Sequence, residues 1–208
     1  MSYRIYIPDD SAALALGADD IANAIAQFAQ EHDLDLQLVR NSSRGLFWAE
    51  PLLEVDTAQG RMAYGPVGID DVAGLCQAQF WLGAAHPLCL GLVEEIDYLK
   101  RQQRLMFARM GVTRPLSLDD YLAHEGFVGL KRCLAMQPDQ IVNEVVESGL
   151  RGRGGAAFPT GIKWKTVAVA QAAQKYIVCN ADEGDSGTYS DRMTMEGDPF
   201  MLIERMTI

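Results

Sequence analysis

Residues 149–164, GLRGRGGAAFPTGIKW, constrain this chain more than any other stretch. Flexible linkers combine glycine with serine and avoid large aromatic residues, so this segment is not typical of a linker. Glycine lets backbone N–H groups approach a flat ring or a phosphate, and successive N–H groups form an anion-binding concavity. Arg153 and Lys163 add positive charge, and Phe158 offers a stacking face. The segment therefore predicts a loop that holds a flat, anionic cofactor.

Two other interpretations of the same glycines remain open. Gly152, Gly154 and Ala157 match the dinucleotide pattern G-x-G-x-x-[GA], which requires a strand before it and a helix after it. The preceding residues IVNEVVES have a helical pattern, which argues against a Rossmann dehydrogenase. A strand directly before Gly152 would support that interpretation, and a helix would overturn it. The remaining alternative is a structural loop whose glycines satisfy turn geometry.

Composition restricts the possible partners. The 208 residues are 49% hydrophobic and 22% charged, as in an ordinary soluble globular protein. The formal net charge of -10 argues against a nucleic-acid partner and against binding to anionic membranes. The start of the chain lacks the pattern of a secretory signal, and the most apolar stretch, residues 80–93, is too short to cross a bilayer. We therefore expect a cytoplasmic protein without membrane insertion.

The four cysteines do not predict a metal site. They stand at positions 76, 89, 133 and 179 and form no C-x-x-C pair. In the cytoplasm such isolated cysteines are usually buried or incidental thiols. No iron–sulfur or other metal site is therefore expected within these residues.

The first eighty residues predict a compact α/β unit. Residues 3–7 and 34–38 alternate as strands, and the apolar positions of residues 19–32 recur at helical spacing between them. Residues 52–56 and 61–64 predict a hairpin with Gly60 in its loop. A helix follows at residues 70–82. The order β-α-β-β-β-α, with a parallel crossover before an antiparallel hairpin, fits a thioredoxin-like arrangement.

The later part of the chain predicts helices and one further strand. Helices are expected at residues 94–110, at residues 118–124 with Ser117 as the cap, and at residues 138–148. Residues 175–179 predict a buried strand that ends at Asn180, and ligand sites in α/β folds favour such strand ends. Clustered acids follow it. They are a possible metal site, but acids grouped in a loop are more often solvated turn residues.

The motifs ESGLRGRGGAAFPTGIKW, VCNADE and GTYSDR together resemble the family of flavin-carrying, NADH-oxidising subunits of respiratory complex I and its soluble relatives. Within that family, DEGDSGTYSDRM and DPFMLIE are most similar to the flavin (β) subunits of soluble NAD-dependent formate dehydrogenases. The flavin subunits of NAD-reducing hydrogenases are near neighbours. The first eighty residues, at Glu50-Pro51 and Tyr64-Gly65-Pro66-Val67, resemble the thioredoxin-like domain that binds a [2Fe-2S] cluster in a partner subunit. The cluster cysteines are missing, so the resemblance implies a degenerate copy that serves as a docking surface.

The resemblance also implies cofactors and site residues. FMN and NAD(H) would bind, and hydride would pass directly between nicotinamide and flavin, with no catalytic side chain. The residues expected to line FMN are Gly152, Arg153, Gly154, Gly155, Lys163, Asn180, Asp182 and Glu183. Those expected to face NAD(H) are Gly155, Ala156, Phe158, Lys163 and Asp185, with Phe158 stacked on adenine. Ala157, Asp185 and Ser186 replace the usual Gly, Glu and Pro, which we expect to tune affinity.

The fold class predicted is α/β, with three parts. Residues 1–82 form the degenerate thioredoxin-like domain, residues 83–116 a helical linker, and residues 117–208 the amino-terminal part of an FMN/NADH-binding domain. The family resemblance implies that the rest, with a [4Fe-4S] site, lies in a longer polypeptide. The expected function is an NADH/FMN diaphorase module of a formate dehydrogenase. Its expected partners are a small [2Fe-2S] thioredoxin-like subunit and a catalytic subunit that oxidises formate or hydrogen. The alternatives are a hydrogenase or complex I flavin subunit and a non-catalytic docking module.

Overall fold

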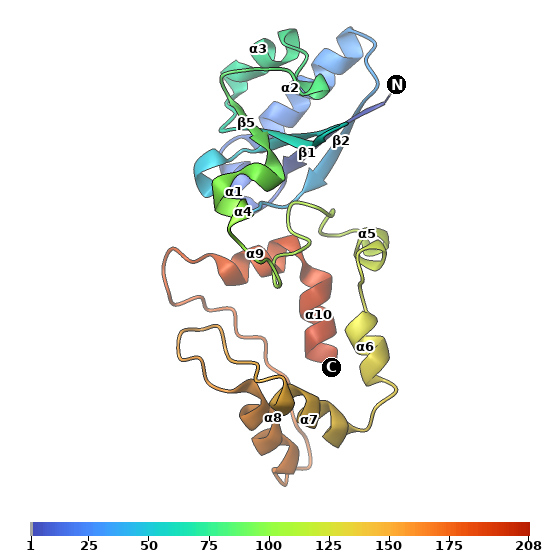
Figure 1. Ribbon diagram of the computed structural model, residues 1–208, viewed down its shortest axis with the longest axis vertical. Coiled ribbons are helices and arrows are strands. Elements are labelled where there is room, and N and C mark those ends of the chain that lie inside the picture. Colours follow the sequence, from blue (N-terminus) through green and yellow to red (C-terminus); the bar gives the residue numbers. More distant parts are fainter. Residues whose placement is uncertain (1) are drawn as a thin grey trace. The chain divides into compact units, whose positions relative to one another are not determined.

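The computed structural model describes residues 2–208, which divide into two compact units (Figure 1). The first unit contains the chain up to His124 together with Ala181–Leu202, and the second contains Glu125–Asn180 and Ile203–Ile208. Residues 181–202 thus join the compact unit of the amino-terminal sheet. The units do not follow the expected boundaries at residues 82 and 116, and the division into three functional domains stays a prediction.

The first unit is built on a five-stranded sheet of order β2-β1-β3-β4-β5. The strands are β1 (Tyr3–Pro8), β2 (Leu36–Asn41), β3 (Leu53–Thr57), β4 (Gly60–Tyr64) and β5 (Cys89–Leu92). β1 pairs in parallel with β2, and the remaining pairs are antiparallel. The predicted parallel crossover and antiparallel hairpin are confirmed. β5 was not predicted, because its four residues include a glycine and lack a clear alternation.

The core of this unit follows from the sequence periodicity. Ile5 and Ile7 are fully buried at alternate positions of β1, and Ile21 and Ile25 are fully buried four positions apart on α2 (Ala18–Glu31). These spacings put each pair on one face of its element. α2 packs beside α3 (Val72–Gln77) over the sheet (Figure 1). The mixed α/β class predicted for this region is confirmed.

Short helices complete the first unit. They are α1 (Ser11–Ala15), η1 (Phe47–Ala49), η2 (Ile69–Asp71), η3 (Phe80–Leu82), η4 (Val93–Glu95), α4 (Asp97–Lys100), α5 (Leu118–Ala123) and α9 (Ser190–Gly197). The helix predicted at residues 70–82 is divided among η2, α3 and η3. The Ser117 hydroxyl accepts a hydrogen bond from the Asp120 N–H at 3.2 Å, as the capping prediction requires.

The helix predicted at residues 94–110 is wrong. Only η4 and α4 are helical there, and the chain continues irregularly from Arg101 to Ser117. Tertiary contacts hold this segment instead: Arg104 Nη2 donates to the Arg44 carbonyl at 3.0 Å, and Arg109 Nε donates to Asp198 Oδ2 at 2.7 Å. Such contacts outweigh helix propensity, which is a weak local preference.

The second unit is helical. It contains α6 (Val128–Cys133), α7 (Pro138–Glu147) and α8 (Thr160–Val169), together with the end of α10 (Pro199–Thr207). The predicted helix at residues 138–148 is confirmed as α7. α7 and α8 pack closely. Gly161 permits this approach, since a Cβ added there would lie only 2.5 Å from the Val146 Cα.

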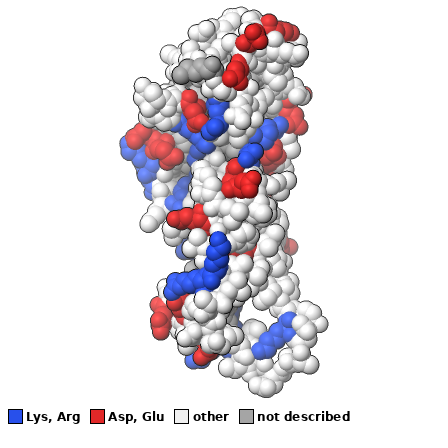
Figure 2. Space-filling view, turned by 90° about the vertical axis from the view of Figure 1, so that its right-hand side faces the viewer, with Lys and Arg blue, Asp and Glu red and all other residues white. Residues whose placement is uncertain are grey.

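Charge is distributed without a single-sign face in the view of Figure 2, where Lys and Arg are interspersed with Asp and Glu. Among residues 2–208, every helix is too short or too polar to cross a bilayer.

Candidate functional site

The glycine loop lies between α7 and α8, and its two ends are tied together. The Gly152 N–H donates to the Phe158 carbonyl at 2.9 Å, and the Thr160 N–H donates to the Leu150 carbonyl at 2.8 Å. Arg151 Nη1 also donates to the Ala157 carbonyl at 3.0 Å. A helix, not a strand, precedes Gly152, so the Rossmann interpretation is overturned.

The loop between those ties presents glycine backbone to solvent. Residues 151–158 are all exposed, nothing lies within 4 Å of a Cβ added at Gly154, and Gly155 has a φ of +100°. A residue with a Cβ rarely adopts that φ, so Gly155 is required by the conformation. The Gly152 N–H is already used by Phe158. The Gly152 N–H therefore stabilises the loop by an internal hydrogen bond and is not available to a ligand. Gly154, in contrast, leaves open space for a ligand.

The cationic and aromatic groups lie beside the glycines. Lys163 Nζ on α8 is 5.7 Å from the centroid of the Phe158 ring, and Phe158 is 46% exposed. Arg153 and Ala156 are exposed on the loop. The structure thus brings together seven predicted site residues, which are Gly152, Arg153, Gly154, Gly155, Ala156, Phe158 and Lys163.

Ala157 adopts a strained backbone conformation. Its φ of +50° lies in the left-handed region, where a residue with a Cβ costs about 1–2 kcal/mol. At this position the resemblance described above leads us to expect a glycine. The loop therefore keeps a conformation suited to glycine although a methyl group is present.

The strand predicted at residues 175–179 is wrong. This segment has no strand, and the side chains of Tyr176, Ile177 and Val178 are 78%, 69% and 82% exposed. A strand needs a neighbour that satisfies its backbone groups, and the described part of the second unit contains no strand to pair with it. Asn180, at the end of this segment, is exposed.

The acidic loop that follows belongs to the first unit. Asp182 and Asp185 are exposed, and the Asp185 carbonyl accepts from Thr188 Oγ1 at 2.9 Å. The Glu183 carboxylate accepts from the backbone N–H groups of Asp191 and Arg192 at 3.0 and 3.2 Å. Glu183 therefore closes the first turn of α9, a role that its position in the sequence did not indicate.

These hydrogen bonds also set the charge of Glu183. Desolvation raises the pKa of its carboxyl, but hydrogen bonds from the N–H groups of Arg192 and Asp191 and from the side chains of Thr188 and Ser190 together lower it by more, and the pKa lies below its ordinary value. The Glu183 carboxylate is thus held in its charged form.

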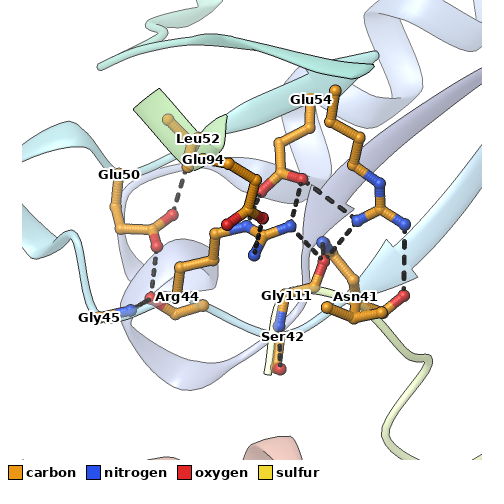
Figure 3. A network of polar contacts seen from close by, with 12 residues as sticks. Asn41, Ser42, Arg44, Gly45, Glu50, Leu52, Glu54, Glu94 and Gly111 are labelled. Carbon is orange, nitrogen blue, oxygen red and sulfur yellow. Dashed lines mark hydrogen bonds and ion pairs between the residues drawn. The ribbon is translucent and has the colours of Figure 1, made fainter. Parts of the chain in front are cut away.

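A buried polar network in the first unit was missed by sequence reasoning. Glu54 on β3 accepts from Arg44 Nε at 2.5 Å and from Arg61 Nη1 at 3.2 Å (Figure 3). Arg44, Arg61 and Asn41 all donate to the Gly111 carbonyl. The network ties residues 101–117 to the sheet. No sequence pattern indicates it, because its members are up to 70 residues apart.

Other reactive groups are not gathered into a site. Among residues 2–208, no group of three or more His, Cys, Asp or Glu side chains is arranged to hold a metal ion. Cys76 is buried, and burial raises the pKa of its thiol to about 11. A thiol with a raised pKa is a poor nucleophile at neutral pH.

The glycine loop lies in the part of the chain that is similar to known proteins. Residues 145–208 match the model of the Nuo51 FMN-binding domain. The chain is 50% identical over 109 residues to the NADP-reducing hydrogenase subunit HndC of Solidesulfovibrio fructosivorans, and 43% identical over 111 residues to an NADH-quinone oxidoreductase subunit of Aquifex aeolicus.

The extent of these matches is limited. They cover 52% and 53% of this chain but only 22% and 26% of the two relatives, so the chain spans about a quarter of their length. A thioredoxin-like [2Fe-2S] ferredoxin from Aquifex aeolicus is similar in structure at 15% identity and a TM-score of 0.38, covering 43% of this chain and 97% of the ferredoxin.

The family match supports FMN and NAD as the cofactors, and the loop geometry fits them. Open space at Gly154 and the positive φ of Gly155 leave room for a phosphate or a ring edge. Arg153 and Lys163 supply the positive charge that a phosphate requires. Phe158 is exposed enough to stack on a base.

Proposed function

We propose that this chain is the amino-terminal part of an NADH/FMN oxidoreductase module, a diaphorase, which passes electrons between NAD(H), FMN and iron–sulfur clusters. The observation that carries the proposal is the exposed glycine loop, with Lys163 beside Phe158, inside the segment that matches an FMN-binding domain. The two relatives compared above are named as subunits of a hydrogenase and of a quinone oxidoreductase.

When bound, FMN supplies the chemistry that joins a two-electron hydride donor to one-electron carriers. The residues of this chain bind and orient. Arg153 and Lys163 balance phosphate charge, Phe158 stacks on the adenine of NAD(H), and Asn180 offers both a donor and an acceptor. No side chain would need to act as an acid or base, since a bound flavin would take hydride directly from the nicotinamide.

We further propose the setting of this module. Formate is the electron donor, oxidised by a separate catalytic subunit, and hydrogen is the alternative donor. A small [2Fe-2S] thioredoxin-like subunit is the second partner, and a [4Fe-4S] site lies in the part of the relatives' length that this chain does not span. Residues 1–82 act as a degenerate thioredoxin-like domain. The assembly is cytoplasmic.

The first experiment is a visible spectrum of the full-length protein with its natural partners, before and after anaerobic NADH. A flavin band that bleaches supports the diaphorase function. A colourless full-length preparation contradicts it and favours the docking module. Replacing NADH by formate and then by hydrogen, without NADH, identifies the donor, because only the true donor bleaches the flavin.

Two variants separate the diaphorase from the docking module. Arg153→Ala and Lys163→Ala each remove a charge that the proposal assigns to cofactor binding. We expect slower NADH oxidation in the intact complex. A docking module predicts unchanged NADH oxidation.

A further inference from the structure

The acidic loop at residues 182–189 leads directly into α9, and α9 belongs to the same unit as the preceding residues up to His124, the amino-terminal domain. Both the N–H and the hydroxyl of Ser11 donate to Glu196 Oε2, at 3.0 and 3.1 Å. Just beyond the helix, Asp198 is buried and accepts from Arg109 Nε at 2.7 Å. A Cβ added at Gly197 would lie 3.0 Å from Ser42 Oγ. The last turn of α9 is therefore fixed.

An aromatic contact holds the other end of α9. Phe47, in η1 of the amino-terminal domain, meets Tyr189 edge to face, with ring centroids 5.1 Å apart and an interplanar angle of 76°. The Arg192 guanidinium carbon lies 4.7 Å from the Tyr189 centroid and 5.5 Å from the Phe47 centroid. Both contacts have favourable geometry for aromatic and cation–π attraction. Tyr189 is the residue that joins the acidic loop to the helix.

Hydrogen bonds also tie the acidic loop to the start of α9. Glu183 accepts from the N–H groups of Asp191 and Arg192, and from Thr188 Oγ1 at 3.1 Å. The hydrogen bonds of Glu183 thus close residues 183–191 into a compact loop that contains Tyr189. Tyr189 therefore lies within the same hydrogen-bonded loop as Asp185.

We propose that Phe47 is a positioning residue for the acidic loop, and that the amino-terminal domain thereby sets the affinity for NADH. This rests on the proposed function, in which Asp185 faces NAD(H). Phe47 acts through Tyr189 and Arg192 and touches no cofactor. This positioning role does not require an iron–sulfur cluster in the amino-terminal domain.

The test uses the full-length protein with its partners and compares Phe47→Ala with Phe47→Tyr and Phe28→Ala. Phe28 is the matched control: it is another aromatic residue of the same domain with a ring partner, its centroid 4.0 Å from that of His32. Loss of one aromatic contact corresponds to roughly a two- to tenfold change in affinity. We expect the Phe47→Ala variant to show this rise in KM for NADH, with kcat and FMN content unchanged. Phe47→Tyr restores the KM, and Phe28→Ala leaves it unchanged.

An unchanged KM in Phe47→Ala, or an equal rise in Phe28→Ala, overturns the proposal. If the wild-type complex does not oxidise NADH, the proposed function fails, and hydrogen exchange decides the positioning role separately. Faster exchange at the Asp191 and Arg192 amides in Phe47→Ala, but not in Phe28→Ala, supports it. Exchange as slow as in the wild type overturns it.

Discussion

Phe158 shows how one side chain bears on the proposed chemistry. It is 46% exposed, and Lys163 Nζ lies 5.7 Å from its ring centroid. A ring in this position offers a surface for a nucleotide base next to a positive charge. Neither residue belongs to the core of the second unit, so each can be changed with little effect on folding.

We expect Phe158→Ala to raise the KM for NADH more than it lowers kcat. One lost aromatic contact corresponds to about 0.5–1.5 kcal/mol, roughly a two- to tenfold change. Steady-state kinetics of the full-length complex measures both parameters, and Phe158→Tyr, which keeps the ring, is the control. An unchanged KM removes Phe158 from the NAD site.

Glu50 is a buried carboxyl with hydrogen bonds but no cation beside it. It accepts from the Ser43 hydroxyl at 2.5 Å and from the Leu52 N–H at 3.0 Å (Figure 3). Burial raises its pKa from 4.5 to about 7, against the opposing effect of those two hydrogen bonds. The folded protein therefore binds this proton more tightly than the unfolded chain does. The stability that protonation contributes is complete below pH 4.5 and is lost as the pH rises through about 7.

Glu50→Gln tests this linkage, because glutamine is neutral at every pH. The shift corresponds to roughly 3 kcal/mol. We expect urea unfolding to show the variant gaining about that much stability over the wild type between acidic pH and pH ~8. Glu31→Gln, on the exposed surface of α2, is the control and gains nothing. A wild-type pH dependence retained in Glu50→Gln contradicts the assignment.

At the scale of elements, the α7–α8 pair depends on one glycine for packing and on another for ligand access. A Cβ at Gly161 would lie 2.5 Å from Val146 Cα, a backbone atom that cannot turn aside. A Cβ at Gly154 would meet nothing within 4 Å. Substitutions at these two positions therefore test helix packing and cofactor binding independently.

We expect Gly161→Ala to destabilise the helix pair by about 1–3 kcal/mol, the usual cost of overpacking. Hydrogen exchange of the α7 and α8 amides measures it. Gly154→Ala should leave this protection unchanged while reducing the FMN retained by the full-length protein. Equal protection in the two variants would show that the helices do not need the close approach at Gly161.

At the scale of the whole molecule, the Arg44–Glu54–Arg61 network ties the irregular segment at residues 101–117 to the sheet. The side chains of Arg44 and Glu54 are 5% and 2% exposed. Removing one charge from a buried pair leaves the other uncompensated, which typically costs about 3–5 kcal/mol.

We expect Glu54→Gln to lower the free energy of unfolding by about 3–5 kcal/mol. The matched control is Glu94→Gln, because Glu94 Oε1 also faces Arg44, at 4.0 Å, but its side chain is 86% exposed. Exposed pairs contribute about 1 kcal/mol or less. Urea unfolding compares the two, and equal losses would argue against a buried network.

The elements that could be predicted from the sequence are those whose periodicity is local. Fully buried isoleucines alternate along β1 and recur four positions apart on α2, and a short turn joins β3 to β4. Each of these patterns lies within a few residues. The glycine loop is local too, and its glycines permit the exposed backbone and the positive φ of Gly155. The cofactor roles of its residues stay a prediction.

Only the tertiary structure decided the rest. Residues 94–110 have a helical pattern, but contacts from Arg104 and Arg109 to distant residues hold them in an irregular path. Residues 175–179 have the composition of a strand but lack a neighbour among the described residues. Glu183, which is predicted to line FMN, also closes the first turn of α9. Local propensity is decisive only where the rest of the chain supplies matching contacts: distant partners override it at residues 94–110, and no pairing strand among the described residues supports it at residues 175–179.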